Sequence, residues 1–284
     1  PDERYEEWFQ SAPELREERN KFEKINREVA DGRRKIEDTH KEICELEKKK
    51  KRLESTSESF KTVQKLIEKF NKDDKNEFKI QTIVKNINTK NTNVILGDKN
   101  IVLYGDGYIK DKLGNYVFKI SPMSFYQTNP IQTEVLYNKA IEAAKLKKSD
   151  VVLDLYCGIG TIGIYASSFV SKVYGIEIVE QAIEDAKENA MINNIENIKF
   201  KCGAVENILE DLIKEENIAP NIVFVDPPRR GLDKNTIDNI LKLRPEKVIY
   251  ISCNPATMVR DINMMEGEYQ IKEIQPVDMF PYTS

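Results

Sequence analysis

One cysteine near the C-terminus stands where a reactive thiol is expected. Cys253 follows an apolar run over residues 247–251 that is typical of a buried strand, and it precedes Asn254-Pro255, where a helix can begin. In an open α/β sheet the chemistry gathers at the carboxyl ends of the strands. A helix N-terminus also lowers the pKa of a nearby thiol. The pattern therefore predicts that Cys253 is a nucleophile, against the alternative of a small buried residue in the core.

A glycine-rich turn upstream is typical of a nucleotide-type cofactor site. An apolar strand over residues 151–155 leads into a turn that contains Tyr156, Gly158 and Thr161. Glycines let the backbone approach a ligand, and the helix that follows offers free N–H groups. Glu177 ends the next strand about twenty residues later, at the spacing of a carboxylate that binds the hydroxyls of a ribose. The turn alone fits a nicotinamide cofactor and S-adenosylmethionine equally well.

A carboxylate and two prolines follow a further apolar strand. Asp226 comes directly after residues 221–225 and begins the run Asp-Pro-Pro-Arg-Arg-Gly at 226–231. Each proline fixes its own φ and restricts the residue before it, so the strand leads into a stiff, extended platform. A carboxylate in this position needs a polar partner. Because nicotinamide enzymes do not require such a platform, the run favours S-adenosylmethionine.

Three runs together resemble the RNA uracil-carbon-5 methyltransferases, which form 5-methyluridine in bacterial ribosomal and transfer RNA. They are Phe-Tyr-Gln-Thr-Asn-Pro at 125–130, the platform at 226–231 and Ser-Cys-Asn-Pro at 252–255. The resemblance covers roughly residues 81–284. It implies a class I, Rossmann-like methyltransferase fold, and it favours ribosomal RNA over transfer RNA as the substrate.

The resemblance also implies a mechanism and a set of site residues. Cys253 would add to carbon 6 of a uridine, so that carbon 5 can take the methyl group of S-adenosylmethionine. Arg229 would hold a uracil carbonyl or a flanking phosphate. Family members often have asparagine where this chain has Thr161. The cofactor-binding positions, with one glycine of the turn, are Gln127, Tyr156, Gly158, Thr161, Glu177 and Asp226.

The general base of the family is expected to be missing from the chain as given. In the family, a glutamate removes the carbon-5 proton, and its motif follows directly on a run such as Met-Phe-Pro-Tyr-Thr at 279–283. The sequence stops at Ser284, so we expect either that the catalytic domain is truncated at its C-terminus or that the molecule is impaired in turnover. Two alternatives therefore stay open: an inactive RNA-binding or scaffold protein on this fold, and a nicotinamide oxidoreductase.

Composition limits the remaining possibilities. With 44 basic and 48 acidic residues the formal charge is -4, so RNA binding must depend on local basic patches and on a pocket for a flipped base. The four cysteines are widely scattered and include no C-x-x-C pair, which argues against a zinc site and a disulfide framework and favours a reducing cytoplasm. No metal site is expected. Cys157 and Cys202 are expected to be buried residues of the core. Neither a signal peptide nor a membrane span is expected.

The chain divides into three expected parts. Residues 1–58 are highly charged with apolar residues at heptad spacing, which predicts a helix or coiled coil that pairs with itself or another chain. Residues 59–120 contain short alternating runs, near 78–84, 92–96, 100–104 and 116–120, which predict a small α+β subdomain with an antiparallel sheet. Residues 121–284 repeat strand and helix, with strands near 151, 173, 198, 221, 247 and 271. That repetition predicts a doubly wound parallel sheet.

Overall fold

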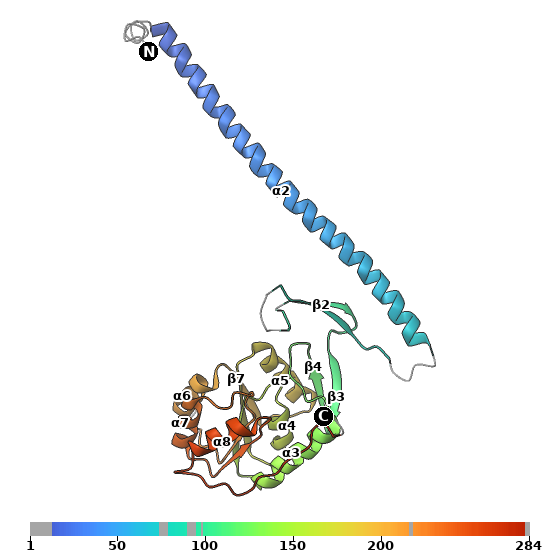
Figure 1. Cartoon of the computed structure of the whole chain (residues 1–284), viewed down its shortest axis with the longest axis vertical. Helices are drawn as coiled ribbons and strands as arrows, with labels where there is room; N and C mark the ends of the chain where they lie inside the picture. The colour runs from blue at the N-terminus through green and yellow to red at the C-terminus, as the bar shows by residue number, and fades with distance from the viewer. Residues whose placement is uncertain (1–12, 74–78, 90–94, 98, 216–217, 282–284) are drawn as a thin grey trace. The chain divides into compact units, whose positions relative to one another are not determined.

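The computed structural model describes residues 13–73, 79–89, 95–97, 99–215 and 218–281. Contacts between residues divide the chain into two compact units, residues 1–79 and 80–284. The described part of the first unit is dominated by one helix, α2, which spans Pro13–Lys72 (Figure 1). Its 60 residues correspond to a length of about 90 Å.

The sequence of α2 explains why it continues so far. Oppositely charged side chains one turn apart, such as Lys21 and Glu17 at 2.7 Å, each stabilise the helix by about 0.2–0.5 kcal/mol. Residues 59–72 contain neither proline nor glycine, so the helix runs past the boundary expected at residue 58. Apolar residues of the heptad pattern are exposed, among them Phe22 at 65%.

The second unit is built on a parallel sheet of five strands in the order β7-β6-β5-β8-β9. The strands are β5 (Val151–Leu155), β6 (Lys172–Glu177), β7 (Ile198–Cys202), β8 (Ile222–Val225) and β9 (Lys247–Tyr250). From β5 the chain moves outward through β6 and β7, then returns to place β8 on the other side of β5. The order of the strands therefore reverses between β5 and β8, as in a doubly wound sheet.

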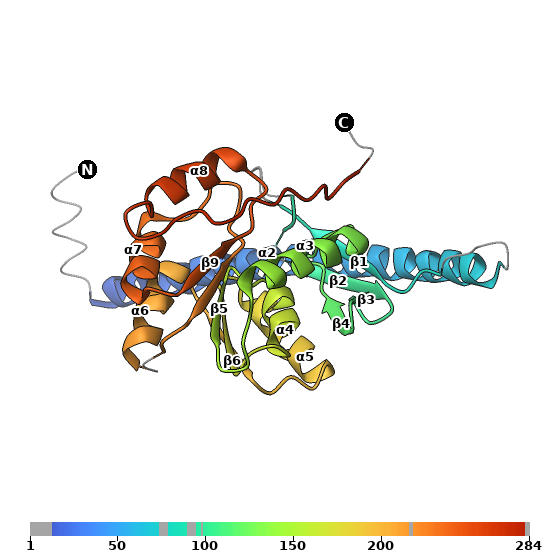
Figure 2. The ribbon, with the colours of Figure 1, turned by 90° about the horizontal axis from the view of Figure 1, so that it is seen from below.

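Helices cover both faces of this sheet (Figure 2). They are α3 (Pro130–Ala144), α4 (Thr161–Ser167), α5 (Glu180–Ile192), α6 (Val205–Glu215), α7 (Lys234–Leu243) and α8 (Pro255–Asn263). Successive side chains of a strand point to opposite faces. In β5, Val152 joins the core cluster that contains α3, α4 and α5 residues, whereas Leu153 and Leu155 join the cluster of α6 and α7. The prediction of a doubly wound α/β sheet is confirmed.

Two antiparallel strand pairs precede the parallel sheet. They are β1 (Ile83–Ile87) with β2 (Lys99–Tyr104), and β3 (Ile109–Leu113) with β4 (Tyr116–Ile120). The sequence predicted one sheet here and no strand at β3, which has only two apolar residues. β3 forms because β4 pairs with it across a tight turn at Gly114, whose φ is +57°. Of the strand expected at 92–96, residues 92–94 lie outside the described residues, and 95–96 form no strand.

Two asparagines of α5 attach the β3–β4 hairpin to the second unit. The side-chain amide of Asn193 accepts from the Val117 N–H at 2.8 Å and donates to the Val117 carbonyl at 2.7 Å. One turn earlier, Asn189 accepts from the Lys119 N–H at 2.7 Å and donates to its carbonyl at 3.2 Å. These side chains bond the edge of β4 as a neighbouring strand would. The hairpin therefore belongs to the same compact unit as the parallel sheet.

The strand expected near residue 271 is absent from the described structure. Residues 269–278 have no regular secondary structure. Ile271 and Ile274 are 58% and 70% exposed, and their spacing of three does not match the two-residue period of a strand. Pro276 in addition lacks the N–H that strand pairing requires.

Candidate active site

Four predicted site residues lie at the carboxyl edge of the parallel sheet. Tyr156 follows β5, Glu177 is the last residue of β6, Asp226 follows β8, and Cys253 follows β9 by three residues. Because all five strands run in the same direction, their carboxyl ends meet at one edge. The point where the strand order reverses, between β5 and β8, is where ligands bind in sheets of this kind.

The glycine-rich turn after β5 is shaped by close packing on one side and open space on the other. Gly160 has φ of +81°, and a Cβ there would come within 2.8 Å of the Phe200 ring, so only glycine fits. Gly158 has φ of +54°, and a Cβ there would meet nothing within 4 Å. The turn therefore leaves an unfilled space beside Gly158, where a ligand can approach the backbone.

Glu177 is held by two backbone N–H groups, one of which belongs to Gly158. Its Oε2 accepts from the Gly158 N–H at 3.2 Å, and its Oε1 accepts from the Val179 N–H at 2.9 Å. Each carboxylate oxygen has a second lone pair that remains available for another donor. The orientation of the carboxylate is thus set before any ligand binds.

A second carboxylate of this edge, Asp154, was not predicted as a site residue. It is fully buried in β5, where its Oδ2 accepts from the Gly163 N–H at 2.8 Å and its Oδ1 has no hydrogen-bond partner. Burial raises the pKa of Asp154 to about 8, the Gly163 bond opposes the rise, and the Asp226 and Glu177 charges add to it. One sequence feature could have indicated Asp154: it is a lone aspartate inside the apolar run Val-Val-Leu-Asp-Leu.

Asp226 stands at the opening between β5 and β8. Its N–H donates to the Leu155 carbonyl at 3.4 Å, which continues the pairing of the two strands by one residue. Burial raises the pKa of Asp226 to about 6. A cation placed beside a carboxyl group with a raised pKa stabilises the ionised carboxylate and lowers that pKa.

The other predicted cofactor residues surround the glycine turn less directly. Thr161 is the first residue of α4, and its hydroxyl forms a 3.0 Å hydrogen bond with the hydroxyl of Tyr137, which is buried. The Tyr156 ring packs against the α6 and α7 core cluster, so its backbone, with φ of +63°, is what lines the turn. Gln127 is half-buried in the segment before α3.

Asn-Pro steps begin α3 and α8, the helices that follow the Gln127 segment and Cys253. Asn129 caps α3 by accepting from the Gln132 N–H at 3.1 Å. Asn254 caps α8 by accepting from the Ala256 N–H at 3.1 Å, which places Cys253 immediately before a helix N-terminus. From the sequence, a cap at Asn129 was one of two open interpretations, the other being a role in the site, and a helix was expected to begin at Pro255.

The described cysteines differ in exposure. Cys253 and Cys202 are exposed, and Cys157 is buried. The prediction for Cys157 is therefore confirmed, and the one for Cys202 is wrong, because Cys202 ends the outermost strand of the sheet instead of filling its core. In the described part of the chain, no three His, Cys, Asp or Glu side chains gather as metal ligands would.

Comparison with known proteins decides the family. A model of the tRNA (uracil-5-)-methyltransferase family matches residues 2–284. The chain belongs to this family. The match confirms the resemblance, and it includes the N-terminal segment that the sequence motifs left unassigned.

Among the described helices, none combines the length and the hydropathy of a membrane span.

Individual relatives agree with this assignment. Uncharacterized RNA methyltransferases of Oceanobacillus iheyensis and Bacillus cereus are 48% and 50% identical to the chain over 206 residues, which are 72% of this chain and 45% of theirs. The crystal structure of Pyrococcus abyssi tRNA (uracil-54, C5)-methyltransferase in complex with S-adenosyl-L-homocysteine is similar with a TM-score of 0.59 and 32% identity, over 74% of this chain and 50% of that one. The chain thus spans about half the length of these relatives, and its second unit has the fold of the family.

Proposed function

We propose that this protein methylates carbon 5 of a uridine in RNA, with S-adenosylmethionine as the donor and Cys253 as the nucleophile. One observation carries the proposal: the thiol and the Asp226 platform follow adjacent strands, β9 and β8, and their loops are bonded to each other. Asn254 donates from its side-chain amide to the Arg229 carbonyl at 3.0 Å. The family assignment and the S-adenosyl-L-homocysteine in the Pyrococcus abyssi relative support the same activity.

The carboxyl edge has the features that S-adenosylmethionine requires. The open space beside Gly158 suits a ligand that approaches the backbone, and Glu177 offers two oriented oxygens for ribose hydroxyls. Asp226 offers a carboxyl group whose ionised form a cation would stabilise. When bound, S-adenosylmethionine supplies an electrophilic methyl group on a positively charged sulfur.

The role of Cys253 follows from the chemistry of uracil, whose carbon 5 is a weak nucleophile. Addition of the thiolate forms a bond between Sγ and carbon 6, and the displaced electron pair generates an enolate. Carbon 5 of that enolate then takes the methyl group. A base must afterwards remove the carbon-5 proton, so that the electron pair restores the double bond and the bond to sulfur breaks.

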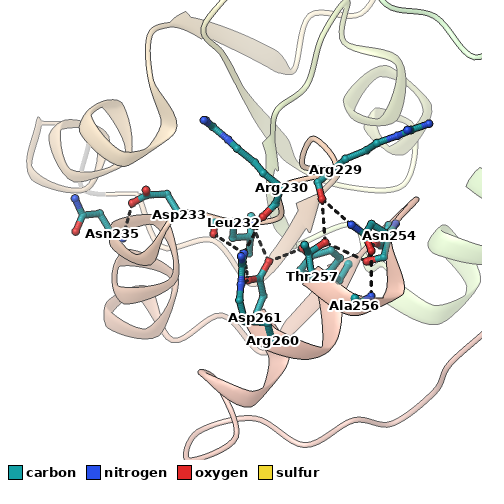
Figure 3. Close-up of polar contacts among 12 residues, drawn as sticks. Arg229, Arg230, Leu232, Asp233, Asn235, Asn254, Ala256, Thr257, Arg260 and Asp261 are labelled. Atoms are coloured by element: carbon teal, nitrogen blue, oxygen red, sulfur yellow. Dashed lines mark hydrogen bonds and ion pairs between the residues drawn. The ribbon is translucent and has the colours of Figure 1, made fainter.

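Two arginines of the platform supply positive charge for RNA. The side chains of Arg229 and Arg230 are exposed and extend away from Asp261 (Figure 3). Their main-chain carbonyls are held by hydrogen bonds, at 3.0 Å from Asn254 and at 2.9 Å from Arg260. Because this backbone is held in place, the two guanidinium groups can bind phosphates or a uracil carbonyl.

Labelled methyl transfer tests the proposal. The protein is incubated with methyl-deuterated S-adenosylmethionine and, separately, with unmodified ribosomal and transfer RNA transcripts. Mass spectrometry of nuclease digests should find the label in 5-methyluridine or in nucleotides attached to Cys253, and Cys253→Ser should abolish both. Label on another base, or NAD bound in preference to S-adenosylmethionine, would contradict the proposal. The two RNA classes test the preference for ribosomal RNA, which stays a prediction.

A further inference from the structure

A buried carboxylate of α8 accepts hydrogen bonds from Leu232, which follows the platform, and from Tyr250, the last residue of β9. Figure 3 shows this carboxylate beside Leu232 and Arg260. Asp261 is fully buried, and its Oδ2 accepts from the Tyr250 hydroxyl and from the Leu232 N–H, both at 2.7 Å. Its Oδ1 accepts from the guanidinium of Arg260 at 2.9 and 2.6 Å. A charge removed from water needs such partners, so each of these four hydrogen bonds is costly to remove.

The same guanidinium extends the contacts to the platform. Arg260 Nη2 also donates to the carbonyls of Arg230 and Leu232, at 2.9 and 3.3 Å. Between them, Gly231 has φ of +79°, and a Cβ there would come within 2.4 Å of Asp261 Oδ2. The platform loop, residues 226–232, therefore approaches α8 so closely that only glycine fits.

The nucleophile loop, residues 251–254, and the first turn of α8 are bonded to the platform loop. The Thr257 hydroxyl donates to the Arg229 carbonyl at 3.2 Å, beside the bond from Asn254. Tyr250 immediately precedes the loop and is bonded to Asp261. Both loops are thus held by α8, although they are separated in the sequence by α7 and β9.

We propose that Asp261 is a positioning residue, which with Tyr250 and Arg260 holds the platform loop and the nucleophile loop as one rigid body. The separation of the Cys253 thiol from the Asp226 carboxylate is then fixed before RNA binds. The proposal rests on the function proposed above, because it assigns to this separation a role in attack on the base. Misplacement of reacting atoms by about 1 Å can cost up to about 100-fold in rate.

A pair of Tyr→Phe variants separates positioning from general stability. Tyr250→Phe removes one hydrogen bond to Asp261. Tyr165→Phe removes a comparable bond, 2.6 Å to Asn138, on the opposite face of the sheet. With 5-fluorouridine RNA and saturating S-adenosylmethionine, Tyr250→Phe should lower the rate constant of covalent adduct formation about tenfold, and S-adenosylmethionine affinity should change less than about twofold. Tyr165→Phe should leave both unchanged.

Equal rates for Tyr250→Phe and the wild type would overturn the proposal, as would an equal loss in both variants.

Hydrogen–deuterium exchange of Asp261→Asn supplies a measurement that does not depend on methyl transfer. Amides of both loops should exchange faster in that variant, and protection unchanged in either loop would contradict a rigid body. If the wild type forms no adduct, the proposed function fails, and the exchange data still decide whether Asp261 couples the loops.

Discussion

Burial sets the charge of the acidic residues beside the open space of the site. Asp154 lies inside β5 and Asp226 at the end of β8, and burial raises the pKa of the first to about 8 and of the second to about 6. Glu177 instead receives two backbone N–H groups. The edge thus combines one oriented carboxylate with two carboxyl groups that favour a cationic ligand.

The raised pKa of Asp226 predicts that S-adenosylmethionine binding depends on pH. Below about 6 the carboxyl group is protonated and neutral, and above it the group is ionised and attracts the sulfonium. Affinity should therefore rise with pH, by about tenfold between pH 5 and pH 7. Titration calorimetry measures it, and Asp226→Asn should flatten the profile. An affinity in the wild type that does not change over this range would remove Asp226 from the donor site.

Replacement of Glu177 tests the ribose contact. Glu177→Ala should weaken S-adenosylmethionine binding by roughly 1.5–3 kcal/mol, the range of hydrogen bonds to a charged group. Glu180→Ala is a matched control, because Glu180 is an exposed acid three residues further on, in the first turn of α5. Equal affinities of Glu177→Ala and the wild type by calorimetry would mean that the ribose lies elsewhere.

Among the helices and strands, the sequence predicted those features that depend on residues close by in the chain. Apolar runs predicted the five parallel strands, and the Asn254-Pro255 step predicted the first turn of α8. Asp261 could not be found in this way, because its partners come from β9 and from the platform loop. The strand β3 was missed for the same reason, since it depends on β4 and not on its own composition.

The contact between α5 and the β3–β4 hairpin gives a prediction about stability. Asn193→Ala leaves the N–H and carbonyl of Val117 without their side-chain partners, and it should destabilise the fold by about 1–3 kcal/mol. Urea denaturation measures the loss. Asn235→Ala, at an exposed position early in α7, should change stability by less than about 0.5 kcal/mol. A similar small effect of Asn193→Ala would show that the hairpin is held by its apolar contacts alone.

In the whole molecule, contacts separate a unit dominated by the long helix α2 from a unit that contains the parallel sheet. The contacts divide the chain at residue 79, whereas composition placed the boundary at residue 58. The difference arises because residues 59–72 have helix-forming sequence and continue α2. An isolated helix gains little stability without packing, so pairing of α2 with a second copy or another chain stays a prediction.

Deletion of residues 1–79 tests this division. The remaining chain contains all the strands of the described structure and every residue assigned to cofactor binding. It should bind S-adenosylmethionine with an affinity within about twofold of that of the whole chain, a change of about 0.4 kcal/mol. Sedimentation of the two proteins shows in addition whether α2 mediates self-association. An unfolded deletion variant would place the boundary inside the catalytic unit.

Trapping with 5-fluorouridine RNA shows whether Cys253 attacks the pyrimidine ring. The fluorine on carbon 5 cannot leave as a proton does, so the methylated adduct persists whichever base serves the enzyme. Cys202 is the matched control, because it is also exposed and also ends a strand of the sheet. With S-adenosylmethionine present, we expect a covalent complex that survives denaturing electrophoresis, with the nucleotide on the peptide that contains Cys253. Cys202→Ser should form this complex, and Cys253→Ser should not. A complex that persists in Cys253→Ser, or no complex in the wild type with S-adenosylmethionine bound, would show that Cys253 is not the nucleophile.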